Sequence, residues 1–156
     1  MTGPNVFDDE WDEGFPPTPG WTSKVKRLIP GGNDLGMSLY ELPPGQTQVV
    51  YHFHHGNEEA LVVLRGRPTV RTPSGERELE PGDVVFFPKG PDGAHQVFNR
   101  SDDAARYVIA ASHVSPEVVE HVDSGKVLAM SRIGGLWTVH RRDDAVDYLD
   151  GESPRG

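Results

Sequence analysis

Short apolar runs alternate with turn-forming residues along most of the chain from residue 37 onward. Each run is followed by a segment rich in Gly, Pro, Asn or Asp, the residues that tight turns require. This rhythm is typical of the strands of barrels and sandwiches, so we expect an all-β domain. The predicted strands are 37–42, 48–54, 60–65, 69–72, 77–79, 84–87, 95–99 and 105–112.

The runs 60–64 and 84–87 are apolar on both strand faces. Side chains alternate across a strand, so an apolar residue at every position means that neither face is suited to water. In so small a domain, the outer face of the sheet then needs a cover. We expect a second copy of the chain, in a homodimer, or the terminal arms to supply it.

The 156 residues most simply form one domain, and a chain of this length can bury a sizeable core. We expect an extended N-terminal arm and first turn at 1–36, a barrel at 37–112, and an irregular C-terminal extension at 113–156 that packs on the barrel. A proline break at Ser115-Pro116 ends the strand pattern, and the residues after it are predicted to form either a helical turn or an irregular strap.

The formal net charge of −9 argues against nucleic acid and against an anionic membrane surface as partners, because both attract clustered Lys and Arg. The first twenty residues carry five acidic residues and no Lys or Arg, which is typical of an extended arm. They also lack the basic and apolar regions of a signal peptide, and no apolar run approaches 18 residues. With no cysteine for disulfides or thiolate sites, we expect a cytoplasmic protein.

Candidate chemistry is concentrated in residues 51–66, YHFHHGNEEALVVLRG. His52 and His54 share one strand face, whereas His55 points to the other. Glu59 opens the return strand of the hairpin, where its carboxylate can come back beside the two imidazoles. Imidazole and carboxylate suit Fe, Mn, Ni, Cu or Zn. By itself, His-x-His is also compatible with histidines that merely decorate a strand surface.

The surrounding spacing resembles that of the cupin superfamily, in particular its small single-domain bacterial members. Two motifs carry the resemblance: Gly45, His52-x-His54, Glu59 and Gly66, then Gly82, Pro88-x-Gly90, His95 and Asn99. Two departures are visible, since the gap before His52 is one residue longer than usual and four residues rather than two separate Gly90 from His95. We expect these additions to lengthen turns without removing a ligand.

The resemblance implies a jelly-roll barrel, also called a double-stranded β-helix, with one divalent transition metal inside it. It assigns the metal ligands as His52, His54, Glu59 and His95. We expect His55 to lie on the opposite face. Glu58 is expected to be solvated or to accept a hydrogen bond from a ligand histidine.

A metal held by three histidines and one glutamate keeps open coordination positions, which is what distinguishes a catalytic site from a structural one. We therefore expect a metal-dependent enzyme of the isomerase, lyase or dioxygenase type. Its substrate would be a small polar metabolite, such as a sugar or an organic acid, bound inside the barrel. The alternatives are a non-catalytic cupin that binds a small molecule, and a metal-free scaffold.

Overall fold

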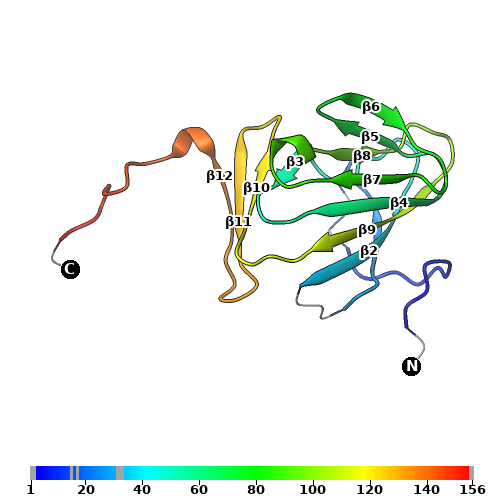
Figure 1. Ribbon diagram of the computed structural model, residues 1–156, viewed down its shortest axis with the longest axis horizontal. Helices are drawn as coiled ribbons and strands as arrows, with labels where there is room; N and C mark the ends of the chain where they lie inside the picture. Colours follow the sequence, from blue (N-terminus) through cyan, green and yellow to red (C-terminus); the bar gives the residue numbers. More distant parts are fainter. Residues whose placement is uncertain (1–2, 15, 17, 31–33, 155–156) are drawn as a thin grey trace.

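The computed structural model describes residues 3–14, 16, 18–30 and 34–154, and these form a β-rich molecule without an α-helix (Figure 1). Parts of the arm and first turn expected at 1–36 lie outside the described residues. The strands are β1 (Lys24–Arg27), β2 (Leu35–Leu42), β3 (His52–His54), β4 (Glu59–Arg65), β5 (Thr69–Thr72), β6 (Gly75–Glu78), β7 (Val84–Phe87), β8 (Gln96–Phe98), β9 (Ala105–Ser112), β10 (Glu117–His121), β11 (Lys126–Met130) and β12 (Trp137–Arg141). Two 3₁₀ turns, Pro91–Gly93 and Arg142–Asp144, complete the described elements.

The strands form two walls of a jelly-roll barrel, which confirms the predicted fold class. One wall is a five-stranded antiparallel sheet in the order β1-β2-β9-β4-β7. The other consists of a four-stranded sheet, β12-β11-β10-β3, and a three-stranded sheet, β6-β5-β8. A bridge between His52 and His95 joins these two pieces beside β3 and β8. Within the described residues, no helix is long and apolar enough to cross a membrane.

The barrel core lies between the walls and follows the alternation of side chains along the strands. On β4, Leu61 and Val63 are fully buried, and on β9 Tyr107 and Ile109 face the same interior. This is the inward half of the two-faced apolar pattern in the sequence. The buried cluster consists of Leu42, Leu61, Val63, Val70, Leu79, Phe87, Val97, Tyr107 and Ile109.

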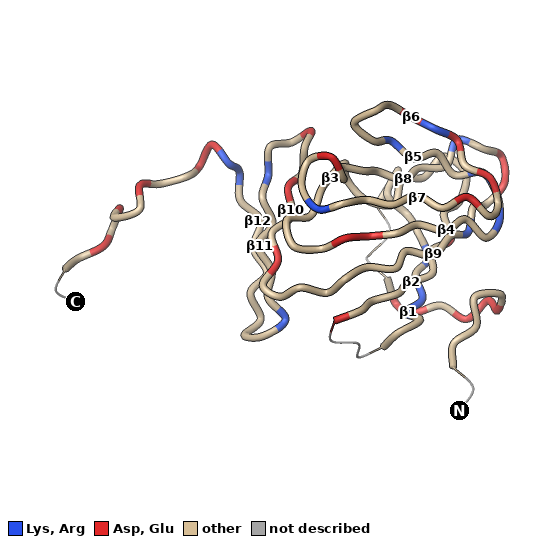
Figure 2. Tube along the Cα trace, in the orientation of Figure 1, with Lys and Arg blue, Asp and Glu red and all other residues tan. Residues whose placement is uncertain are grey.

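The N-terminal arm covers part of the outer face of the five-stranded sheet. Its acidic residues lie beside basic residues of β1 and β9 (Figure 2). Arg106 of β9 contacts Asp9 at 2.7 Å and Glu41 of β2 at 2.6 Å, and Lys26 of β1 contacts Asp8. β1 is thus a strand in the stretch expected to be an arm and first turn, because it pairs with β2 along its whole length.

The same outer face is uncovered over β4 and β7, where the other half of the two-faced pattern lies. Val84 and Phe86 point outward with exposed fractions of 63% and 59%, and Leu35 at the start of β2 is exposed by 50%. Leu35 and Phe86 border a shallow hollow whose floor includes Ala60 and Ala110. The intramolecular arm therefore provides only part of the expected cover.

The C-terminal extension is more regular than the sequence pattern indicated. Residues 117–121 form β10, so the expectation of a helical turn or an irregular strap was wrong there. β10 pairs with β3 on one side and β11 on the other, and Val119 is buried while Val118 is exposed, the alternation of a strand. After β12 the chain leaves the barrel as an extended tail, in which Tyr148 is 96% exposed (Figure 1).

Candidate metal centre

Strand β3 presents His52 and His54 to the barrel interior. The strand is held on one side by β10, where His52 pairs with His121 and His54 with Val119. Because residues two apart on a strand share a face, both imidazoles point inward, and their ring centroids are 5.0 Å apart. This is the relation that the His-x-His spacing predicted.

Glu59 enters the same space from the first position of β4. It pairs with Phe87 of β7 and Ala111 of β9, so its backbone is fixed from both sides. The short link between β3 and β4 is itself hydrogen-bonded, since the N–H of Gly56 donates to Glu117 Oε1 at 3.0 Å and Asn57 Oδ1 accepts the N–H of Val114 at 2.7 Å. The carboxylate therefore approaches the histidines from the neighbouring wall of the barrel.

His95 is the most deeply buried of the four predicted ligands, with an exposed fraction of 2%. Its backbone exchanges two hydrogen bonds with His52, at 2.8 and 3.1 Å. Its ring lies against that of Phe87, with a centroid distance of 3.8 Å and an interplanar angle of 9°. Backbone pairing and ring stacking together leave this imidazole little freedom to rotate.

The four side chains lie close together in the barrel interior. Glu59 Oε2 lies 3.1 Å from His95 Nε2 and 3.6 Å from His54 Nε2. Ligand atoms of His52, His54 and Glu59 lie within 4.8 Å of one another, so this group could hold a metal ion. His95 is not in this group, but its Nε2 contacts Glu59 and its ring centroid lies 4.7 Å from that of His52.

The far nitrogens of two rings have backbone partners. His52 Nδ1 lies 2.9 Å from the carbonyl oxygen of Val50, and His95 Nδ1 lies 2.9 Å from that of Gly93. A carbonyl oxygen only accepts, so each Nδ1 carries a hydrogen, and when the ring is uncharged its Nε2 lone pair is left for the interior. This is the tautomer that a metal ligand needs, so the donor set fits a transition metal.

The electrostatic state of the site also suits a cation. Burial, together with smaller contributions from the neighbouring His95 and His54, lowers the pKa of His52 to about 3. Burial alone would raise the pKa of Glu59, but the hydrogen bond with His95 and the nearby histidines bring it below its ordinary value. At neutral pH, His52 is therefore uncharged and Glu59 ionised, the forms in which both bind metal.

Polar side chains that the sequence analysis did not single out line the interior near this group. Tyr40 of β2 stacks on Tyr107 of β9 at 5.7 Å, and the Tyr107 hydroxyl donates to Gln48 Oε1 at 2.8 Å. Burial raises the pKa of Tyr40, and the negative charge of Glu59 raises it further, so the phenol stays protonated and can donate to a ligand. Strand parity could have identified Tyr40 in the sequence, because Tyr40 lies two residues before the buried Leu42 and therefore on the same inward face of β2.

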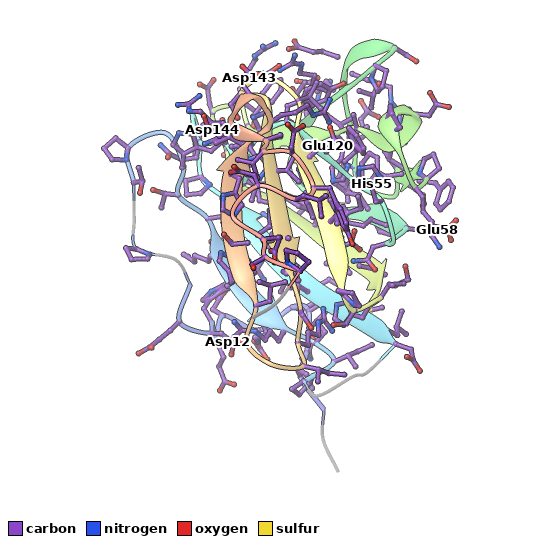
Figure 3. The ribbon with its side chains drawn as sticks, turned by 90° about the vertical axis from the view of Figure 1, so that its left-hand side faces the viewer. Asp12, His55, Glu58, Glu120, Asp143 and Asp144 are labelled. Carbon is purple, nitrogen blue, oxygen red and sulfur yellow. The ribbon has the colours of Figure 1, made fainter. Side chains whose placement is uncertain are left out.

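The structure separates His55 and Glu58 from the convergent group. His55 Nε2 lies 2.8 Å from Glu120 Oε1 on the other face of β3 and β10, and Figure 3 shows the two residues together. Glu58 is exposed, and its backbone N–H donates to Ser112 Oγ at 2.8 Å. Neither side chain is among those that converge on Glu59.

Comparison with known proteins gives the family context. Residues 38–111 match the family model described as a cupin domain, and this range contains both sequence motifs. No significant match is found among curated proteins.

Solved structures are similar over most of the chain. A proposed sugar phosphate isomerase from Acidithiobacillus ferrooxidans is 27% identical, with a TM-score of 0.75 over 83% of this chain and 82% of the other. A sugar phosphate isomerase from a cupin superfamily, from Silicibacter pomeroyi, is 25% identical, with a TM-score of 0.73 over 82% of each chain. The polyketide cyclase RemF from Streptomyces resistomycificus is 22% identical over 75% of this chain and 83% of its own, with a TM-score of 0.61, and supports the fold alone.

Proposed function

Because the chain belongs to the cupin superfamily, we propose that it is a metal-dependent enzyme acting on a small polar metabolite inside the barrel. The cofactor is one divalent transition metal, of the group Fe, Mn, Ni, Zn and Cu. Its ligands are His52, His54, Glu59 and His95. The convergence of imidazole nitrogens and a carboxylate within 4.8 Å of one another is the observation that carries this proposal.

Within this class we favour isomerisation of a sugar that bears a carbonyl group. Two structural relatives, at 27% and 25% identity and with TM-scores of 0.75 and 0.73, are described by this kind of activity. Bound metal would supply Lewis-acid polarisation of a carbonyl oxygen. The chain itself contributes a protonated phenol at Tyr40, which can orient a polar substrate by donating a hydrogen bond. Phe87 stacks on His95 and so helps to fix the orientation of this ligand.

The first experiment is elemental analysis of protein purified without chelator, then again after supplementation with each of the five metals. Wild-type protein should retain close to one metal per chain, and His95→Ala should lose most of it, because removing one ligand weakens the whole set. His55→Ala is the matched control, since its ring faces Glu120 outside the convergent group. Absence of stoichiometric metal in the supplemented wild type would overturn the proposal.

Turnover is then assayed on a panel of sugars, sugar phosphates, keto acids and phenolic acids, before and after metal removal. We expect metal-dependent isomerisation of at least one sugar. Turnover of only another class would assign lyase or dioxygenase chemistry instead. A small molecule that is bound and released unchanged, with no turnover across the panel, would identify the chain as a non-catalytic binding cupin.

We also propose that a second copy of the chain covers the exposed part of the five-stranded sheet. The outward positions Val84, Phe86 and Leu35 support this, since contiguous exposed apolar side chains are typical of an interface. Light scattering should give a dimer for the wild type and a monomer for Phe86→Asp. Phe7→Asp, another exposed position, should remain dimeric; a monomeric wild type at micromolar concentration would contradict the proposal.

A further inference from the structure

His54 differs from the other two inward histidines at its far nitrogen. The Nδ1 atoms of His52 and His95 each have a backbone carbonyl at 2.9 Å. His54 Nδ1 is buried and has no hydrogen-bond partner among the described residues. A ligand imidazole needs an acceptor there, because that bond fixes the tautomer and the orientation of the ring. Of the three proposed ligand histidines, His54 is thus the one whose far nitrogen has no acceptor among the described residues.

Glu117, the first residue of β10, has an unpaired acceptor oxygen that could complement the unpaired nitrogen of His54. Its exposed fraction is 2%, and its Oε1 accepts hydrogen bonds of 3.0 Å from the backbone N–H groups of Gly56 and Val118. Its Oε2 is buried and has no hydrogen-bond partner among the described residues. An unpaired buried carboxylate oxygen is energetically costly, so it requires an explanation.

Strand register places the two unpaired atoms on the same face. His54 pairs with Val119, and Glu117 lies two residues before Val119 on β10, so its side chain projects toward the same interior as His54. The next same-face position after His54 along its own chain is Gly56. A Cβ added there would lie 3.0 Å from Glu117 Oε2. The absence of a side chain at Gly56 therefore leaves the place beside His54 to this carboxylate.

The Glu117 carboxylate can reach His54 Nδ1 through a short hydrogen-bonded connection. Same-face positions along one strand are about 7 Å apart, a span that one bridging water or a change of side-chain rotamer can cover. The other nearby carboxylates are unsuited, because Glu120 contacts His55 on the opposite face and Glu58 is exposed.

We propose that Glu117 is the positioning residue of His54. Its carboxylate accepts the Nδ1–H of His54, directly or through one water, and so presents His54 Nε2 to the metal. Glu117 does for this ring what the carbonyls of Val50 and Gly93 do for the other two. The inference rests on the proposed metal site, but its central element, the tautomer of His54, exists in the metal-free protein as well.

The test compares Glu117→Gln with Glu117→Leu. Affinity for Zn²⁺ is measured by competition with a chromophoric chelator, and histidine tautomers are read from ¹⁵N chemical shifts of the imidazoles with and without Zn²⁺. We expect both variants to bind Zn²⁺ about 10- to 100-fold more weakly, because Glu117→Gln keeps its one oxygen for the N–H groups of Gly56 and Val118 and turns an NH2 donor toward His54. The Nδ1–H form of His54 should dominate in the wild type and lose its dominance in Glu117→Leu, while His52 and His95 keep theirs.

Asn57→Ala is the matched control, because it tests whether Glu117 acts only by supporting the loop between β3 and β4. Asn57 is also buried and also supports the link between β3 and β4, through a 2.7 Å hydrogen bond from the N–H of Val114, but it offers nothing to His54. Equal loss of affinity in Asn57→Ala and Glu117→Leu, with the tautomer of His54 unchanged, would overturn the proposal. So would a wild-type His54 protonated at Nε2 in the metal-free protein, a result that stands even where a variant fails to fold.

The two proposals fail in different ways. If the wild type binds no transition metal, the proposed metal site is wrong, yet the tautomer of His54 still shows whether Glu117 orients this ring. If the wild type binds metal but Glu117→Leu changes neither the His54 tautomer nor the Zn²⁺ affinity, only the positioning role of Glu117 is wrong.

Discussion

The two ends of the chain contact the barrel in different ways. The N-terminal arm lies on the outer face of the five-stranded sheet and is held largely by charge, through Arg106 and Lys26. The C-terminal extension instead adds β10 to the strand that carries His52 and His54. Charged contacts attach a segment, whereas a β-ladder fixes its register residue by residue. The arm should therefore affect stability without affecting the metal site, and the extension should affect both.

The largest effect is expected at Arg106, which holds the arm to β2. Its side chain is 9% exposed, and its guanidinium also donates a hydrogen bond to the backbone carbonyl of Asp8 at 3.2 Å. Arg106→Met should lower the free energy of unfolding by about 3 kcal/mol, because it leaves the carboxylate of Glu41 half-paired in a nearly buried position. Metal affinity should not change. Urea unfolding and Zn²⁺ titration measure the two quantities.

Arg67→Met is the control for that change. Arg67 forms an ion pair with Glu78 at 2.7 Å, but both side chains are about half exposed. An exposed pair contributes at most about 1 kcal/mol. Equal destabilisation in the two variants would show that the arm is not held by its buried contact.

A smaller loss of stability, with a consequence for the site, is expected at Val119. This residue pairs with His54 and is 4% exposed. Val119→Ala should cost about 2 kcal/mol from lost burial and the remaining cavity. It should also weaken Zn²⁺ binding several-fold, because β10 supports the strand of His54. Val118→Ala, one residue away and 38% exposed, should change neither; an unaltered Zn²⁺ affinity in Val119→Ala would contradict the coupling of extension and site.

His55 tests the outer face of the same pairing. Its contact with Glu120 is partly exposed, and Glu120 keeps Arg142 as a second partner. His55→Ala should therefore cost less than about 1 kcal/mol and leave Zn²⁺ affinity within twofold of the wild type. Chemical denaturation and chelator competition check both values. A large loss of metal would mean that His55 reaches the interior.

The smallest expected effect is the release of the N-terminal arm when Asp9 is protonated at low pH. Its hydrogen bond and charge interaction with Arg106 lower the pKa of Asp9 below its ordinary value. Because the folded value is the lower one, ionised Asp9 favours docking above about pH 4, and this contribution disappears as the pH falls through the lowered pKa.

Fluorine NMR of protein labelled with 5-fluorotryptophan can follow this release at Trp11, whose ring lies 5.0 Å from the Arg106 guanidinium. The Trp11 signal should shift between pH 5 and pH 2. Asp9→Asn should reduce the dependence on pH, whereas identical titrations in both proteins would assign it to other groups.

The barrel strands could be predicted because their signals are local. Runs such as 60–65 and 105–112 combine apolar side chains with turn residues at both ends, and the observed β4 and β9 follow them closely. The relation of His52 and His54 is also local, since it depends only on strand parity. Glu59 could be placed beside them because it opens the return strand of the hairpin, whereas His95 needed the resemblance to a known family, since its contact with Glu59 joins distant parts of the chain.

The remaining elements depend on contacts that the sequence does not display. The stretch KVKR of β1 has no apolar face and becomes a strand by pairing with β2 under the acidic arm. β10 is only five residues long and has two adjacent valines, too short a pattern to distinguish a strand from a helical turn. Glu117 follows a proline and belongs to no motif, so its relation to His54 emerges only from the register of β10 on β3.

The backbone pairing of His52 with His95 has a consequence for the order of events during synthesis. His52, His54 and Glu59 leave the ribosome before His95, and β10 follows later still. A nascent chain therefore offers an incoming ion an incomplete set of ligands, which binds more weakly than the closed barrel. Under the proposed function, a metal bound to this partial set would exchange until the last strands close, so the finished fold would select the ion and not the first encounter.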